Sequence, residues 1–136
     1  MSEKHVALVH RWFEELDRQM GPAPELCTTD YTGHHPGVPP MDLAAHREYS
    51  RAFFAAIPDL KHVILDSVVG GNKVACRVAN RGTHLGTMMG VPATGKAIDA
   101  PAIVIFRIEG DRVAEFWGVF DRLGMLQQVG AGPASE

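Results

Sequence analysis

Apolar positions along the chain follow the period of a helix in the N-terminal part and the period of a strand afterwards. In residues 3–20 they recur at steps of three and four, which is typical of one face of an amphipathic helix. Gly21-Pro22 ends this predicted helix. A second helix is predicted over residues 43–57, with Asp42 as its N-cap and Pro58 at its end.

Beyond the second helix, apolar positions alternate with polar ones, which is the pattern of half-buried strands. The predicted strands cover residues 61–69, 73–85, 96–108 and 113–120, and a last short helix covers 122–129. Glycine-containing turns separate the strands. Because helices come first and antiparallel strands with short turns follow, the sequence predicts the α+β fold class.

The expected architecture is a curved, mixed or antiparallel sheet with the N-terminal helices packed across it. Such a sheet would form a cone that encloses one apolar pocket. The 136 residues suit a single domain, which we expect to span residues 1–130. The small and polar tail, 131–136, is expected to be disordered.

Composition and charge exclude several classes of partner. The net charge is −3 and the basic residues form no stripe, so nucleic acid is not an expected partner. No apolar run approaches the roughly 18 residues of a membrane span, so no membrane partner is expected either. The two cysteines, Cys27 and Cys76, lie in unrelated contexts, which favours a reduced, cytoplasmic protein over a disulfide framework.

An apolar run delivers one carboxylate, that of Asp121, to the junction of the last strand and the last helix. In a dry pocket such a group is suited to general acid/base catalysis, and burial against Trp117, four residues earlier, would make it a better base. The alternative is structural, because aspartate is a preferred residue at a helix N-cap. Capping would make Asp121 a weaker base, and both interpretations stay open.

Two histidines are further candidates for catalysis. His84 shares one face of a strand with apolar residues, where it would polarise a substrate carbonyl or work with Asp121; the alternative is a histidine bonded within the sheet. Of the adjacent pair His34 and His35, we expect His35 to face the pocket, because neighbours in an extended chain point in opposite directions. Neither an HExxH motif nor a helical histidine pair occurs, so no metal and no other cofactor is expected.

Large aromatic and methionine side chains are the expected wall of the pocket and would contact the substrate. They are Trp12, Phe53, Phe54, Met88, Met89 and Trp117. For the helix aromatics, plain core packing is the alternative. The two methionines lie in a loop rich in glycine and proline, where flexible side chains suit a lid over an apolar ligand.

Several short segments occur in an order similar to that of a known family. They are Trp12-Phe13, Ile57-Pro-Asp-Leu60, Gly82-Thr-His-Leu-Gly86 with Pro92-Ala-Thr-Gly-Lys96, and the C-terminal runs 107–117 and 121–130. Through this set, nearly the whole chain resembles the SnoaL-like polyketide cyclases of the nuclear transport factor 2-like superfamily. The resemblance implies ring closure by intramolecular aldol addition without metal or cofactor. It also implies an acid/base role for Asp121, the position that matches the family's carboxylate.

The leading functional hypothesis is therefore a cofactor-free cyclase or isomerase that acts on a hydrophobic, carbonyl-bearing small molecule. The superfamily that the chain resembles also contains hydrolases, dehydratases and non-catalytic binders, so these remain alternatives. Hydrolysis or dehydration would need further charged groups beside Asp121, for which Arg122 and Glu115 are the candidates.

A homodimer or higher homo-oligomer is also expected. A curved sheet leaves an outer face, and apolar side chains on that face would be removed from water between two copies. Val104, Phe106 and Ile108 share one face of the strand predicted over 96–108. The pattern does not distinguish whether this face is the inner or the outer one.

Overall fold

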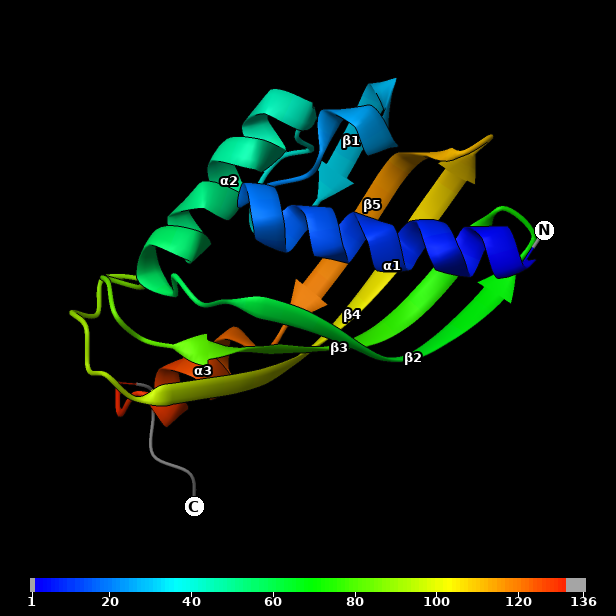
Figure 1. The fold of residues 1–136 in the computed structure, drawn as a ribbon. Coiled ribbons are helices and arrows are strands. Elements are labelled where there is room, and N and C mark those ends of the chain that lie inside the picture. Colours follow the sequence, from blue (N-terminus) through cyan, green and yellow to red (C-terminus); the bar gives the residue numbers. More distant parts are fainter. Residues whose placement is uncertain (1, 132–136) are drawn as a thin grey trace.

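The computed structural model describes residues 2–131, which form helices and one sheet (Figure 1). Helix α1 spans Ser2–Gln19, helix α2 Leu43–Ala56 and helix α3 Arg122–Gln128, and a short 3₁₀ helix, η1, covers Pro24–Leu26. The side chain of Asp42 caps α2 by accepting a hydrogen bond from the backbone N–H of Ala45 at 2.9 Å. The three predicted helices are confirmed to within one residue at each end.

The strands of the described residues form a five-stranded sheet that is curved and does not close into a barrel (Figure 1). β1 spans Cys27–His34, β2 Lys61–Gly70, β3 Lys73–Thr83, β4 Ala97–Glu109 and β5 Arg112–Phe120. Their order across the sheet is β1-β5-β4-β3-β2. β1 and β5 run parallel, and the other neighbouring pairs are antiparallel. Helices packed on a mixed curved sheet confirm the predicted α+β fold class.

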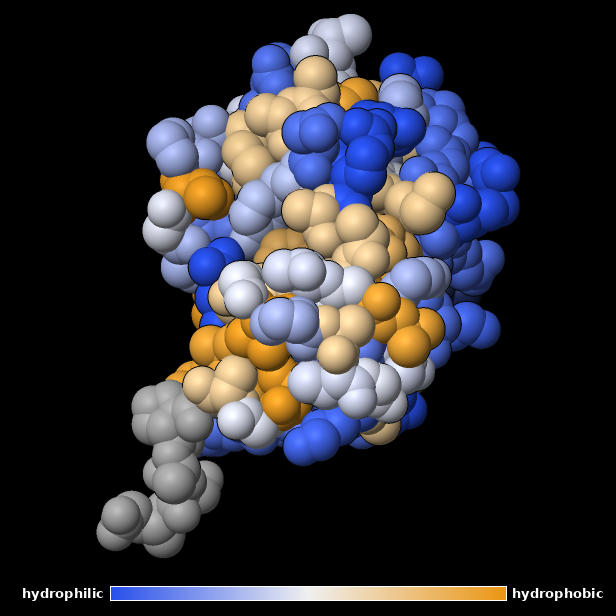
Figure 2. Space-filling view, turned by 90° about the vertical axis from the view of Figure 1, so that its left-hand side faces the viewer, coloured by the Kyte–Doolittle hydropathy of each residue, from blue (hydrophilic) through white to orange (hydrophobic). Residues whose placement is uncertain are grey.

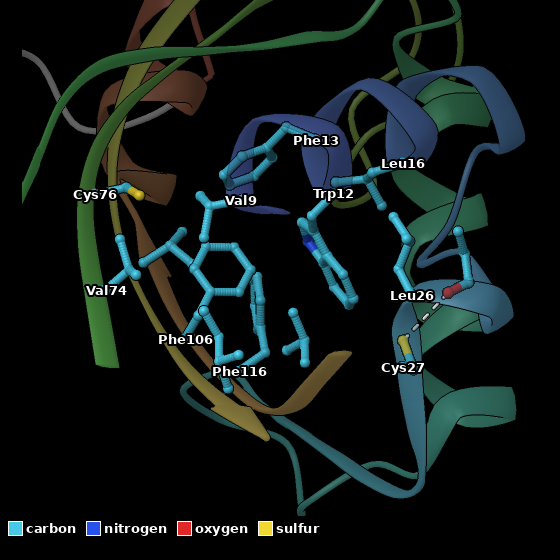
Figure 3. Packing of buried hydrophobic residues seen from close by; sticks show 14 of the residues in the cluster. Val9, Trp12, Phe13, Leu16, Leu26, Cys27, Val74, Cys76, Phe106 and Phe116 are labelled. Carbon is cyan, nitrogen blue, oxygen red and sulfur yellow. Dashed lines mark hydrogen bonds between the residues drawn. The ribbon is translucent and has the colours of Figure 1, made fainter. Parts of the chain in front are cut away.

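Helix α1 lies across one face of the sheet and supplies much of the core (Figures 1 and 3). Trp12 and Phe13 of α1 both meet the ring of Phe106 on β4 edge-on, with ring centroids 5.6 Å apart in each case. Trp12 also packs against Phe116 of β5 at 6.1 Å. Such aromatic pairs add to the free energy gained by burying apolar area, and they hold α1 against the middle of the sheet.

Strand β4 has the alternation that the sequence predicts, and the structure distinguishes its two faces. Val104, Phe106 and Ile108 are buried in the core, whereas Ile103 and Ile105 lie on the outer face. A dimer contact on β4 could therefore use Ile103 and Ile105. Val104, Phe106 and Ile108 are buried in the core and cannot contact a second copy of the chain.

A second group of buried apolar residues lies where α2, α3 and the loop after β3 come together (Figure 1). Phe54 of α2, Met88 of the loop and Met125 of α3 belong to it. Met88 exchanges two backbone hydrogen bonds with Val91, at 2.8 and 2.9 Å, which folds the loop into a tight turn. The loop is therefore anchored in the core through Met88.

The predicted disordered tail falls mostly on residues 132–136, outside the described residues. Within the described part, the N–H of Ala131 donates to the carbonyl of Leu126 at 2.8 Å. No helix within residues 2–131 combines the length and the apolar character needed to cross a bilayer. Cys27 and Cys76 are both buried free thiols.

Candidate functional site

A cavity of about 70 Å³ lies between the inner face of the sheet and helices α1 and α2. With its open side included, the empty space between the lining residues is about 670 Å³. Phenylalanine rings make up much of the wall: Phe13 of α1, Phe53 and Phe54 of α2, and Phe116 and Phe120 of β5. A concave, mostly apolar cavity with a few polar groups is typical of a small-molecule site.

One residue of the cavity lining, near the end of β5, is exposed at the surface. This residue is Val119, which is 56% exposed. Figure 2 views the molecule from the side of α2 and α3 and shows hydrophobic surface gathered in the lower left of this face.

Three residues from different parts of the chain form a polar group at the cavity wall. His35 directly follows β1, and its ring stacks on the ring of Tyr49 of α2 with the centroids 4.6 Å apart. Arg122, at the start of α3, donates a hydrogen bond from Nη2 to the Tyr49 hydroxyl at 2.6 Å. The guanidinium of Arg122 also lies 5.2 Å from the ring centroid of Phe120. Because the hydroxyl oxygen of Tyr49 accepts from Arg122, its own proton remains for a hydrogen bond to a ligand.

His46 of α2 extends this polar group into the protein. Its ring lies 5.3 Å from that of His35, and its Nδ1 shares a 2.7 Å hydrogen bond with the hydroxyl of the buried Tyr31. A Cβ at Gly33 would lie 2.6 Å from Nδ1 of His46, and a Cβ at Gly118 would lie 3.0 Å from the ring of His35. Glycine at these two positions therefore lets the imidazoles approach the strands closely.

Burial keeps these groups in their neutral forms. Burial lowers the pKa of His46 to about 3, and the charge that His35 carries when protonated acts in the same direction. Burial also lowers the pKa of His35 to about 4, and the positive charge of Arg122 lowers it further. A hydrogen bond with the backbone of Gly118 acts in the opposite direction and raises this pKa. For Tyr49, burial raises the pKa, although Arg122 opposes the increase. Both imidazoles and the phenol are therefore neutral at pH 7.

His62 of β2 lines another part of the cavity and is bound to Asp17 of α1. Nδ1 of His62 lies 2.6 Å from Oδ1 of Asp17, and the backbone N–H of His62 donates to the other carboxylate oxygen at 3.1 Å. The ring stacks on Phe13 with the centroids 5.4 Å apart. Asn80 of β3, the pairing partner of His62 across the two strands, also lines the cavity. Asn80 is only 9% exposed, and its Oδ1 has no hydrogen-bond partner.

Within residues 2–131, no three His, Cys, Asp or Glu side chains are grouped so that they could hold a metal ion. The polar groups at the cavity wall are imidazoles, hydroxyls and an amide, with the guanidinium of Arg122 bound to one of the hydroxyls.

The sequence model of the SnoaL-like polyketide cyclases matches residues 7–129, which is most of the chain. The chain belongs to this family. No curated protein gives a significant match.

Solved structures of putative polyketide cyclases and of a putative hydroxylase are similar to this SnoaL-like chain. IdmH from Streptomyces antibioticus, one of the cyclases, is 28% identical, with 94% of this chain and 97% of IdmH covered and a TM-score of 0.78. A second one, from Acidithiobacillus ferrooxidans, is 27% identical, with 95% and 96% covered and a TM-score of 0.79. The hydroxylase is AclR from Streptomyces galilaeus, which is 22% identical, with 100% and 90% covered and a TM-score of 0.87, and shows the fold alone.

Asp121 of this SnoaL-like protein does not line the cavity. Its side chain is exposed and accepts a hydrogen bond from the backbone N–H of Gly124 at 2.8 Å, as the N-cap of α3. Of the two interpretations left open for Asp121, the N-cap is therefore the one observed, and the burial in a dry pocket is not. The physical reason is that the first turn of α3 has unpaired N–H groups, and the carboxylate bonds to one of them. A catalytic role for Asp121 stays a prediction.

Glu115 and Arg122, the residues expected to assist hydrolysis beside Asp121, are engaged elsewhere. Glu115 lies on β5 and pairs with His34 at 2.6 Å and with Arg107 at 3.2 Å. Arg122 is bound to Tyr49. The charged cluster that hydrolysis would need is therefore not formed by these residues.

His84 is fully buried beneath the loop after β3 and does not line the cavity. Its Nδ1 bonds to the hydroxyl of Thr94 at 2.9 Å, and its Nε2 bonds to the carbonyl of Val91 at 3.2 Å. The expectation that His84 faces the pocket is therefore wrong, because both ring nitrogens hold the loop in place.

Three of the nine predicted site residues line the cavity. Phe53, Phe54 and His35 line the cavity, and their roles toward a ligand stay predictions. Trp12, in contrast, is fully buried in the core between α1 and the sheet, as Figure 3 shows. Plain core packing, the alternative considered for this residue, describes its position.

The other three predicted wall residues lie outside the cavity lining. Trp117 stacks on His34, with ring centroids 5.5 Å apart, because its strand position places it on the face opposite Phe116. Met88 is buried in the second group of apolar residues, and Met89 is exposed at the surface. The two methionines therefore do not form the expected lid over the cavity: Met88 is anchored in the core and Met89 is exposed.

Much of the polar part of the cavity was not predicted. His46 and Tyr49 lie three residues apart on the face of α2 that also carries Phe53, so the helical period contained a signal for them. Asp17 likewise follows Phe13 by four residues in α1. Its pairing with His62 had no local signal, because the two residues are distant in sequence.

Proposed function

We propose that this SnoaL-like protein is a cofactor-independent cyclase that performs an intramolecular aldol addition on a hydrophobic, carbonyl-bearing small molecule. The observation that carries the proposal is the hydrogen bond from Arg122 to Tyr49 beside the neutral ring of His35. It leaves a hydroxyl proton of Tyr49 for a substrate oxygen in a largely apolar cavity. Membership of the SnoaL-like polyketide cyclases supports the class of reaction.

The proposed reaction needs proton transfers and no electron acceptor. A base removes a proton from a carbon between two carbonyl groups, and the electron pair of the C–H bond moves onto a carbonyl oxygen to give an enolate. The enolate carbon attacks a second carbonyl of the same molecule, which forms a C–C bond and an alkoxide. The protonated base then returns a proton to the alkoxide.

Tyr49 and His35 would stabilise the negative oxygen of the enolate. A fixed donor in an apolar cavity stabilises developing charge more strongly than the same donor does in water. The charge of Arg122 on the phenol oxygen strengthens Tyr49 as a donor. The aromatic wall, with Phe53 and Phe116, would hold the reacting carbons close together.

Simple binding of an apolar small molecule is the second candidate function. It is favoured by the cavity lining, which contains no carboxylate among the described residues, and by the use of Asp121 as a helix cap. A binder would hold the same ligands and would not accelerate the exchange of an acidic C–H proton.

Deuterium uptake into ethyl benzoylacetate, a hydrophobic 1,3-dicarbonyl ester, tests the cyclase proposal when followed by NMR. We expect the protein to accelerate exchange above the buffer rate. Binding of the ester, seen as chemical-shift changes of the protein, without any acceleration would contradict the cyclase proposal and support simple binding.

A further inference from the structure

Asp17 and His62 form a pair in which one carboxylate holds both the ring and the backbone of the histidine. The ring nitrogen Nδ1 lies 2.6 Å from Oδ1, and the backbone N–H donates to Oδ2 at 3.1 Å. The ring is also stacked on Phe13 and tilted against Phe54, with centroids at 5.4 and 6.3 Å. These contacts from α1 and α2 leave the imidazole of His62 in one orientation.

An imidazole whose Nδ1 is bonded to a carboxylate carries its proton on that nitrogen, so the lone pair of the neutral ring is on Nε2. No hydrogen bond to Nε2 of His62 occurs within residues 2–131, and the residue lines the cavity. We propose that His62 is the general base of the reaction and that Asp17 is its positioning residue. This assignment rests on the proposed cyclase function.

His62 and His35 are two of the three imidazoles that the described residues contribute to the cavity lining, and they differ in the sign of the charge that acts on them. His62 is paired with the anion of Asp17, which stabilises the imidazolium that forms when Nε2 takes up a proton. The charge that acts on His35 is the cation of Arg122, which favours the neutral ring. The cavity therefore has one imidazole suited to accept a proton and another suited to remain neutral beside Tyr49.

Other groups around His62 do not alter this assignment. Phe13 and Phe54 contact the ring without charge, and Asn80 faces it from β3 as a neutral amide. Among the described residues, Asp17 is the charged group that contacts the ring.

Asn80 adds a requirement for the substrate. Its amide is buried beside His62, and Oδ1 lacks a partner, so a ligand that brings a hydroxyl or enol donor to this point would satisfy it. Tyr49 offers a donor in the same cavity to a carbonyl oxygen. The substrate class is thus a carbonyl compound with at least one further hydroxyl or enol group.

In the proposed step, Nε2 of His62 takes the proton from the carbon between two carbonyl groups. The C–H electrons move to the oxygen bound at Tyr49, and the C–C bond forms as described above. The imidazolium of His62 then gives its Nε2 proton to the alkoxide, which restores the starting state of the pair.

The pH profile of deuterium uptake into ethyl benzoylacetate tests this role in the full chain. We expect His62→Gln to lower the enzymatic exchange rate at least about 100-fold. Asp17→Asn should lower the rate at every pH of the profile, and Asp17→Glu, which keeps a carboxylate at this position, should restore part of the rate; a merely structural residue would not show this rescue. His34→Gln is the matched control, because it breaks another histidine–carboxylate pair of the same length, His34–Glu115, outside the cavity. It should leave the profile unchanged.

The outcomes separate the two proposals. No exchange by the parent protein would overturn the cyclase function and the base role with it, whereas exchange that persists in His62→Gln would overturn the base role alone. Long-range ¹H–¹⁵N NMR of the His62 ring in the parent protein keeps the test valid if a variant fails to fold. We expect the proton on Nδ1 at neutral pH, and a proton on Nε2 would overturn the assignment.

Discussion

Arg122 donates a hydrogen bond to the hydroxyl of Tyr49 at 2.6 Å and thereby ties the start of α3 to α2 beside the cavity. The bond uses a lone pair of the phenol oxygen and leaves the phenol proton free. It therefore has a chemical consequence as well as a structural one, and substitutions of the two residues separate these effects.

Tyr49→Phe removes the hydroxyl and keeps the ring that stacks on His35. We expect the rate of deuterium uptake into the 1,3-dicarbonyl ester to fall about 100-fold, because a donor to the enolate oxygen is lost. Binding of the ester, measured by NMR titration, should change little. An unchanged exchange rate in this variant would contradict the role assigned to the hydroxyl.

Arg122→Gln should have a smaller effect on exchange, about 10-fold, because Tyr49 keeps its proton and loses only the charge that strengthens it as a donor. Arg18→Gln is the control for the loss of a cation, since Arg18 pairs with Glu15 in α1 outside the cavity. It should leave the exchange rate at the parent value. If both variants lost the same fraction of the exchange rate, the loss would be an effect of the net charge of the protein, and the role of the bond from Arg122 to Tyr49 would be contradicted.

Asp121 offers a test that separates capping from catalysis. Asparagine also accepts a hydrogen bond at an N-cap, so Asp121→Asn should keep both the stability and the exchange rate. Asp121→Ala should lower the free energy of unfolding by about 1 kcal/mol, measured by urea denaturation, because the N–H of Gly124 loses its acceptor. A folded Asp121→Asn protein without exchange activity would instead make Asp121 the base and contradict the assignment of His62.

Stability should fall as the pH is lowered from about 7 to about 5. The folded-state pKa values of His46, about 3, and His35, about 4, lie below the roughly 6.5 expected in the unfolded chain. The unfolded chain therefore binds more protons in this window, and each histidine contributes a slope of up to about 1.4 kcal/mol per pH unit. Urea denaturation across the window measures this slope.

His46→Gln is the variant that checks the assignment of this slope. It removes one of the two protons taken up on unfolding, so the dependence of the unfolding free energy on pH should become about half as steep. Carboxylates such as Glu115 contribute at lower pH, because their ordinary pKa of 4.5 lies below the window. A slope that is the same in both proteins would contradict the buried neutral state of His46.

Periodicity was sufficient for the three helices, for strands β2 to β5 and for some of the cavity. The alternation in β4 and the spacing in α2 determine which side chains share a face, so Val104 and Phe53 could be grouped correctly with their neighbours. For Asp121 the position before a helix suggested the N-cap that is observed, but no period could decide between capping and burial, because the turn after Phe120 sets the direction of the side chain. The burial of His84 depends on how the following loop folds over it.

The pairing of Asp17 with His62 shows a different limit of sequence analysis. Each residue lies in an element that was predicted correctly, but the contact depends on how α1 crosses the sheet. The same holds for Tyr49 and Arg122, which the sequence separates by 73 positions. The polar groups of the cavity are therefore brought together only by the tertiary structure, and local sequence patterns do not reveal their contacts.

The outer face of the sheet leads to the last prediction, which concerns association. Ile103 and Val119 are paired across β4 and β5, and they are 52% and 56% exposed. Ile105 lies on the same face of β4 and is also exposed. We expect two copies of the chain to associate through this surface, because apolar side chains in adjacent strands gain free energy when they are removed from water together.

Ile103→Asp tests this contact without touching the core. A carboxylate at this position would be buried against apolar side chains of a second copy, so we expect sedimentation to show a dimer for the parent protein and a monomer for the variant. Leu123→Asp is the matched control, since Leu123 is 50% exposed on α3, and it should sediment as the parent does. A parent protein that is monomeric at micromolar concentration would contradict the dimer. A variant that remains dimeric would exclude this face as the contact.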